Sequence, residues 1–196
     1  MLFRSHNQFS GTLPILYVFL ARSGCYIKKV ELLGLNKFGG TSPDHSSTPG
    51  VKISFTRADG AVQTLYYFTT NLANEGIRSE PGFMKFCEAL GTGRSLVKAA
   101  SYLMHTGEFS TVRGFLLTHS ATLVEDDSGI PVKDFDAAKW SLRYYGAYPG
   151  PIELFKQYQQ PELAEFYRVS HAAALPFGFG YRWHAAESSL IVATPK

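Results

Sequence analysis

The sequence predicts an α+β fold, with helices covering an antiparallel or mixed sheet in a single domain. Residues 51–56 and 62–69 alternate apolar and polar side chains and flank an Asp-Gly turn at 59–60, which predicts a β-hairpin meander. Helical patterns fill the middle of the chain and strand-like segments return near its end, without the strict strand–helix alternation of a doubly wound fold. There is no internal repeat and no evident linker, so we predict one domain over residues 1–196.

The composition is that of a globular protein. The chain has 196 residues, of which 45% are hydrophobic and 18% charged, enough for a sizeable core. The net charge is only +3 and the basic residues are scattered, whereas nucleic-acid-binding proteins usually carry a basic stripe. We therefore expect no nucleic-acid partner. Aromatic residues, at 14%, should mainly fill the core, and rings near loops lining a ligand pocket are the alternative.

The apolar run Leu13–Ala21 is far too short to span a bilayer and predicts a buried helix. Thr12 is a suitable cap, Pro14 suits the first turn, and Gly24 is a natural residue just beyond the C-terminus. A signal-peptide core is the alternative, but Arg22 stands where a cleavage site needs an apolar residue. The sequence does not determine the compartment, with the cytoplasm slightly favoured.

Local signals predict the remaining elements in order. Up to residue 91 we expect a strand over 26–33, a mobile loop over 36–50, the hairpin, and a helix over 81–90 that stops at a glycine. Two further helices are expected over 95–105 and 111–122, the second introduced by Ser110, and then a turn over 126–129. The chain is expected to finish with a strand over 140–145, short helices over 152–159 and 161–167, and a strand over 188–194.

Neither the cysteines nor the histidines predict a metal site. Cys25 and Cys87 have apolar neighbours, which favours buried free thiols, and a single disulfide between them is the alternative. None of the six histidines pairs at a metal-ligand spacing. We expect no metal and no cofactor.

Several segments together resemble a family of uncharacterised bacterial proteins. The resemblance covers most of the chain and is carried by residues 11–14, 63–68, 126–131, 150–155 and 175–181. Members of that family are longer at the N-terminus, which implies that this chain is a shortened version starting near Phe9. The family has no activity to carry over, so the resemblance implies no catalytic residues.

Ser95 and Lys98 are the first candidate for catalysis. Residues three apart on a helix point the same way, and a desolvated lysine can deprotonate a serine for acyl transfer. About one such spacing occurs by chance in a chain of this length, so the start of an ordinary helix is the alternative.

Asp126 and Asp127 are the second candidate, beside Glu125 and Ser128. Paired carboxylates can bind a divalent cation, or one of them can act as a general base. The alternative is a capped, solvated turn. Used together or separately, the serine, the lysine and the two aspartates would make the protein a hydrolase, which is our second functional hypothesis.

The segment 175–183 contains four rings, two glycines and an arginine, and carries our first functional hypothesis. Flat rings beside guanidinium groups suit a small molecule, a glycan or a peptide. The predicted ligand-binding residues are Arg143, Tyr145, Tyr148, Phe179, Tyr181, Arg182 and Trp183. The alternative is that this segment only closes the fold. A further copy of the chain is a second predicted partner, because an exposed sheet edge invites one.

Overall fold

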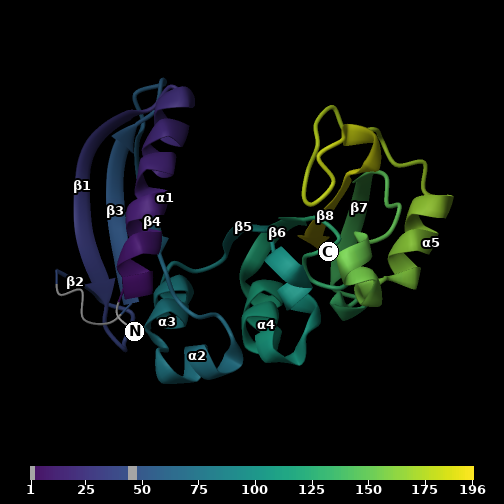
Figure 1. Cartoon of the computed structure of the whole chain (residues 1–196), viewed down its shortest axis with the longest axis horizontal. Helices are drawn as coiled ribbons and strands as arrows, with labels where there is room; N and C mark the ends of the chain where they lie inside the picture. The colour runs from purple at the N-terminus through teal and green to yellow at the C-terminus, as the bar shows by residue number, and fades with distance from the viewer. Residues whose placement is uncertain (1–2, 44–47) are drawn as a thin grey trace. The chain divides into compact units, whose positions relative to one another are not determined.

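The computed structural model describes residues 3–43 and 48–196, and it divides the chain into two compact units, Met1–Leu90 and Gly91–Lys196. Within the described residues each unit has its own four-stranded sheet with helices beside it (Figure 1). One sheet is antiparallel and the other is mixed, which confirms the predicted α+β class. The prediction of one domain over 1–196 stays a prediction.

The first unit is built on the predicted hairpin. Its sheet has the order β2-β1-β3-β4, from strands β1 (Tyr26–Leu35), β2 (Thr41–Ser42), β3 (Thr48–Thr56) and β4 (Val62–Phe68). Gly60 has a φ of +83°, which a residue without a side chain adopts at little cost, and the turn closes where the sequence predicts it. The predicted loop is partly strand, because β3 begins earlier than expected; its residues 44–47 lie outside the described part of the chain.

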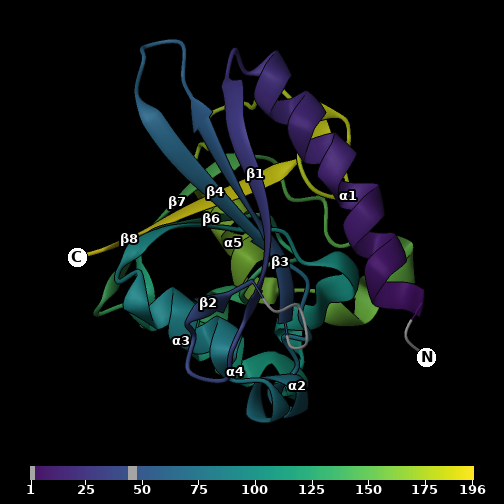
Figure 2. The ribbon, with the colours of Figure 1, turned by 90° about the vertical axis from the view of Figure 1, so that its left-hand side faces the viewer.

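Helix α1 (Phe3–Arg22) lies beside this sheet (Figure 2). It packs on the sheet through Leu20, which forms a buried cluster with Val51 and Ile53. The predicted end is confirmed, because Gly24 follows the helix with a φ of +72°. The predicted start at Thr12 is wrong. Pro14 lies inside the helix and not in its first turn, although an interior proline removes one backbone hydrogen bond and crowds the carbonyl four residues before it.

The opposite face of the sheet packs against helix α3 (Gly82–Ala89), which follows α2 (Asn74–Ser79). Side chains alternate along β4, so Tyr66 and Phe68 point away from the residues that contact α1. The Phe86 ring meets both edge-on, at centroid distances of 5.2 and 5.1 Å. Cys25 and Cys87 are free thiols, as predicted, but both are half-buried and not buried.

The second unit has a mixed sheet of order β5-β6-β8-β7, built from β5 (Gly93–Val97), β6 (Ser120–Glu125), β7 (Trp140–Gly146) and β8 (Ser189–Pro195). Strands β5 and β6 run parallel, whereas β8 pairs antiparallel with both β6 and β7. Around the sheet lie helix α4 (Ser110–His119), helix α5 (Pro161–Val169) and 3₁₀ segments η1 (Ala100–His105), η2 (Gly107–Phe109), η3 (Val132–Asp134), η4 (Glu153–Tyr158) and η5 (Ala185–Glu187).

The prediction of a helix over 95–105 is wrong in its first part, since the only helical turns there are those of the 3₁₀ segment η1 over 100–105, and the end predicted for the helix over 111–122 is also wrong. Residues 93–97 form β5, and the second helix stops at His119, where the central strand β6 begins. The cause is long-range pairing. Two parallel strands need a crossover segment between them, and here α4 and the 3₁₀ turns are that segment. The predicted strands near 140–145 and 188–194 and the helix near 161–167 are confirmed.

Within the described residues, no helix combines the length and the apolar character needed to cross a membrane.

Candidate functional site

The most unusual feature of the second unit is a buried acidic turn, residues 125–128, at the end of β6. Glu125, Asp126 and Ser128 are at most 1% exposed and Asp127 is 7% exposed, so the solvated turn offered as the alternative is wrong. The next residue, Gly129, has no space for a side chain, because a Cβ there would lie 2.3 Å from Glu125 Oε2. Burying a carboxyl group is costly unless it is paired, hydrogen-bonded or protonated. The three carboxyl groups of the turn satisfy this requirement in different ways.

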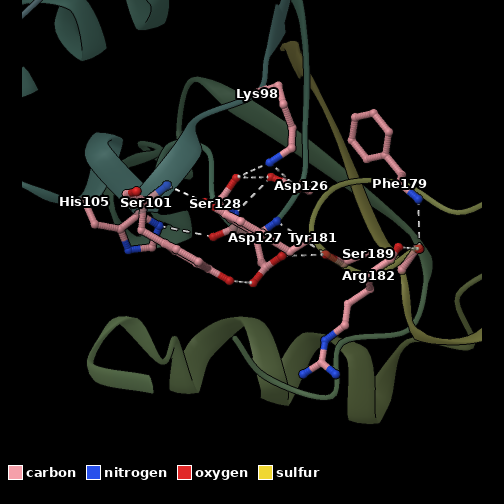
Figure 3. A network of polar contacts seen from close by, with 12 residues as sticks. Lys98, Ser101, His105, Asp126, Asp127, Ser128, Phe179, Tyr181, Arg182 and Ser189 are labelled. Atoms are coloured by element: carbon pink, nitrogen blue, oxygen red, sulfur yellow. Dashed lines mark hydrogen bonds and ion pairs between the residues drawn. The ribbon is translucent and has the colours of Figure 1, made fainter. Parts of the chain in front are cut away.

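Asp126 is paired with Lys98, which follows β5 (Figure 3). The Lys98 Nζ atom lies 3.2 Å from Asp126 Oδ2, as an ion pair without hydrogen-bond alignment, and donates a hydrogen bond to Ser128 Oγ at 3.2 Å. Asp126 Oδ1 accepts hydrogen bonds from the Ser128 backbone N and hydroxyl. Gly180 passes so close that a Cβ there would lie 1.9 Å from Oδ2.

Asp127 is held by hydroxyl groups and not by a cation. Its carboxylate accepts hydrogen bonds from the hydroxyls of Tyr102 and Ser189. Burial raises the pKa of Asp127, and these two hydrogen bonds oppose that shift. Its backbone carbonyl accepts from His105 Nε2 at 3.1 Å and from Gln160 Nε2 at 3.0 Å.

Glu125 has no cation beside it among the described ion pairs. Burial raises its pKa well above the usual range, and nearby Asp126 adds to the shift. Oε2 accepts a hydrogen bond from the Ile130 backbone N at 2.7 Å, whereas buried Oε1 has no hydrogen-bond partner in the described part of the chain. The neutral acid is therefore the favoured form of this side chain.

Three parallel rings lie beside the acidic turn, and we call Tyr158, Tyr102 and Tyr181 the ring stack. Tyr102 lies between the other two, at centroid distances of 5.5 Å and 5.7 Å and interplanar angles of 7° and 1°. Lys98 Nζ lies over the Tyr181 ring, 4.4 Å from its centroid. The ring stack thus ties together η1, η4 and the glycine-rich segment 175–183, three segments far apart in sequence.

The backbone at the ring stack is strained. Ser101 and Tyr102 have φ angles of +56° and +53°, in the left-handed region that bulky residues avoid. Such residues cost of the order of 1–3 kcal/mol each and persist only where surrounding contacts hold them. Here the Tyr181 hydroxyl accepts a hydrogen bond from the Ser101 backbone N, while the Tyr102 hydroxyl is held by Asp127.

The structure places the four predicted catalytic residues in two separate sets of contacts. Ser95 lies on β5 and its hydroxyl shares a 2.7 Å hydrogen bond with Ser120, whereas Lys98 contacts Asp126 and Ser128. The helix that would have aligned Ser95 with Lys98 does not form. Ser128, which the sequence analysis places beside the aspartates without giving it a catalytic role, is the hydroxyl beside the lysine.

The seven predicted ligand-binding residues lie in different surroundings. Tyr181 belongs to the ring stack, and the Tyr148 hydroxyl accepts a hydrogen bond from the Gln160 backbone N. The Arg182 guanidinium donates to loop carbonyls and pairs with Glu187. The Trp183 side chain is 80% exposed, and its ring contacts the His184 ring. The other three are Phe179, bonded through its backbone N to Ser188, and Arg143 and Tyr145, both on β7.

An apolar cavity of about 460 Å³ lies between β7, α5 and η3, and we call it the aromatic cavity. Its rings are packed in pairs: Phe135 meets Trp140 edge-on at 5.6 Å, and Tyr144 stacks on Phe166 at 5.0 Å. Burial raises the pKa of Tyr144 to about 12. The cavity is lined by Val132, Lys133, Phe135, Ala137, Trp140, Ser141, Leu142, Tyr144, Glu162, Phe166 and Lys196.

A second, polar cavity of about 230 Å³ shares two residues with the aromatic cavity, Lys133 and Glu162. Its other lining residues are His105, Pro131, Gln157, Tyr158, Gln159, Gln160 and Pro161. Tyr158 belongs to the ring stack and His105 bonds to the acidic turn, so the buried network forms one wall of this cavity.

Sequence reasoning missed both cavities. The available signal was the spacing of Trp140, Leu142 and Tyr144, which share one face of a strand because side chains alternate. An apolar strand face must be covered by another element, but no local pattern indicated that Phe166 lies on that element.

In comparisons with known proteins, no family model, no curated protein and no solved structure matches the chain. The resemblance to a bacterial family stays a prediction. Among residues 3–43 and 48–196, no group of three or more His, Cys, Asp or Glu side chains is placed to hold a metal ion.

Proposed function

We propose that residues 91–196 bind a small, mainly apolar molecule in the aromatic cavity. The observation that carries this proposal is the cavity itself. Its volume of about 460 Å³ lies within the range of small-molecule sites, which are typically 300–1,000 Å³, and its walls combine rings and aliphatic side chains with a few charged groups.

Hydrolysis is less well supported by the same geometry. Asp126, Asp127 and Ser128 are buried and already bonded to neighbouring groups, so they are poorly placed to reach a substrate. A general base must come within hydrogen-bond reach of the proton that it removes. We interpret the acidic turn and the ring stack as the framework that holds η1 and η4 in place beside the cavities.

Tryptophan fluorescence provides the test. The chain has two tryptophans, Trp140 in the cavity wall and exposed Trp183, so Trp183→Phe leaves a single reporter at the site. We expect 4-nitrobenzyl alcohol, a neutral aromatic quencher, to quench Trp140 in a saturable way. Ala137→Phe, which adds a ring at the cavity wall, should weaken binding strongly.

Ala138→Phe is the matched control, because Ala138 is an exposed neighbour outside the cavity lining. It should leave the quenching curve unchanged. Quenching that rises linearly without saturation, and equally in both variants, would exclude a binding site at this cavity.

A further inference from the structure

The geometry points to a free α-amino acid with an apolar or aromatic side chain as the ligand, with its side chain in the aromatic cavity and its zwitterionic head group at the junction with the polar cavity. This inference rests on the proposed function, because it uses the same aromatic cavity. It adds the charge pattern of the ligand, which the apolar walls alone do not specify.

The two cavities meet at one cation and one anion. Lys133 and Glu162 line both cavities, and both side chains are exposed. Neither takes part in an ion pair within the described residues, although the neighbouring charges do: Asp134 is paired with Arg113 at 2.9 Å, and Glu165 is paired with Arg168. One lysine and one glutamate that are free of ion pairs in the described part of the chain therefore line the same junction.

A zwitterion satisfies both groups at once. Its carboxylate would pair with Lys133 and its ammonium with Glu162, and charge-assisted hydrogen bonds are stronger than neutral ones. A ligand with a carboxylate alone would lie beside Glu162, and a ligand with an ammonium alone would lie beside Lys133. Like charges in proximity oppose binding, so each single-charge ligand would be disfavoured.

The polar cavity supplies neutral hydrogen-bonding groups around that head group. His105 donates from Nε2 to the Asp127 carbonyl, so the neutral ring presents Nδ1 as an acceptor. Burial, the largest influence, lowers the pKa of His105; the hydrogen bond to the Asp127 backbone and the charge of Asp134 oppose this shift, and the charge of Lys133 adds to it. The side chains of Gln157 and Gln159 also line this cavity. An amino acid head group, which carries donors and acceptors, matches this lining.

A free amino acid fits better than a peptide terminus. The α-ammonium and α-carboxylate of one amino acid are joined through a single carbon, so one small molecule brings both charges to the junction that Lys133 and Glu162 line. A peptide end carries only one of the two charges and continues as a chain. We therefore expect blocking either group of the ligand to weaken binding.

The test uses quenching of Trp140 in the Trp183→Phe protein by a matched set of nitrophenyl ligands. We expect 4-nitro-L-phenylalanine to bind about two- to fivefold more tightly than its amide or its N-acetyl derivative, because each lost contact is an ion pair with an exposed side chain. Glu162→Gln should remove the advantage of the zwitterion over the N-acetyl derivative, and Lys133→Gln should remove its advantage over the amide.

Lys156→Gln and Glu165→Gln are the matched controls, since both side chains are exposed and lie outside the cavity linings. They should keep the preference for the zwitterion. Equal affinity for all three nitrophenylalanine ligands, with saturable binding of 4-nitrobenzyl alcohol, would overturn this inference and leave the proposed function standing. If no ligand quenches in a saturable way, the proposed function fails as well.

Discussion

The Tyr102 hydroxyl donates a hydrogen bond to the Asp127 carboxylate from a residue whose own backbone is left-handed. This bond joins the strained η1 turn to the end of the central strand β6. Because the Tyr102 ring also lies between Tyr158 and Tyr181, one side chain connects the acidic turn to the ring stack. The predictions below treat this assembly as a framework whose stability can be measured.

Tyr102→Phe should destabilise the second unit by about 1–3 kcal/mol, because Asp127 is buried and loses one of its two hydroxyl donors. The loss should be larger at pH 8 than at pH 5. The pKa of folded Asp127 is raised, so its contribution to stability is present at low pH and falls as the pH rises through that pKa. Removing a bond to the carboxylate raises the pKa further, so the fall continues to a higher pH.

Urea unfolding followed by tryptophan fluorescence measures this effect, since Trp140 and Trp183 both belong to the second unit. Tyr26→Phe is the control, because the Tyr26 side chain is exposed in the first unit. A Tyr102→Phe protein as stable as the unmodified one at both pH values would show that the bond to Asp127 does not hold the turn.

Glu125→Gln should make the second unit more stable than the unmodified protein as the pH rises towards 8. The folded-state pKa of Glu125 is raised, so the wild-type side chain favours folding at low pH and opposes it as the pH rises through that pKa. A glutamine amide has nearly the same shape and its oxygen can still accept from the Ile130 backbone N. It cannot ionise, so the pH dependence should flatten.

The pH profile of urea unfolding from pH 5 to pH 9 checks this result. Glu108→Gln, at an exposed position of the same unit, should leave the profile unchanged. A Glu125→Gln protein that loses stability at every pH would mean that the carboxylate makes a contact that the amide cannot replace.

How much of this arrangement was predictable depends on the range of the contacts. The hairpin over residues 51–69 was predicted because its alternation and its Asp-Gly turn are local. The segment 95–105 was predicted wrongly because β5 exists only through its pairing with β6, whose register joins Ser95 to Leu123. Local helical spacing cannot reveal a partner strand more than twenty residues away.

The candidate site shows the same division. Asp126 and Asp127 were selected from the sequence as the best polar group, but their burial depends on β8 and on segment 175–183. Tyr181 was selected as a ligand-binding ring, whereas its neighbours in the ring stack come from η1 and η4. The sequence therefore indicates which residue types are available for a site, but the contacts that determine their roles join segments far apart in the chain.

Lys98→Met should destabilise the second unit by about 1–3 kcal/mol. It removes the cation paired with Asp126, which is 1% exposed, together with the bond to Ser128 and the contact with the Tyr181 ring. Losing one partner of a fully buried pair costs more, but the Lys98 side chain is 41% exposed and water screens the interaction.

Lys156→Met, at an exposed surface pair, is the control and should cost little. Equal midpoints of urea unfolding for the two variants would contradict a supporting role for Lys98.

Glycine substitutions provide the last prediction, with opposite signs at two positions. Gly180 has a φ of +78° and a Cβ there would lie 1.9 Å from Asp126 Oδ2, so Gly180→Ala should destabilise the second unit by more than about 2 kcal/mol. Gly114 lies inside α4 with nothing within 4 Å of an added Cβ, so Gly114→Ala should stabilise it by about 0.5–1 kcal/mol. Thermal unfolding of both variants measures the difference. If Gly180→Ala is as stable as the unmodified protein, segment 175–183 does not pack against the acidic turn, and the ring stack would lose its third ring.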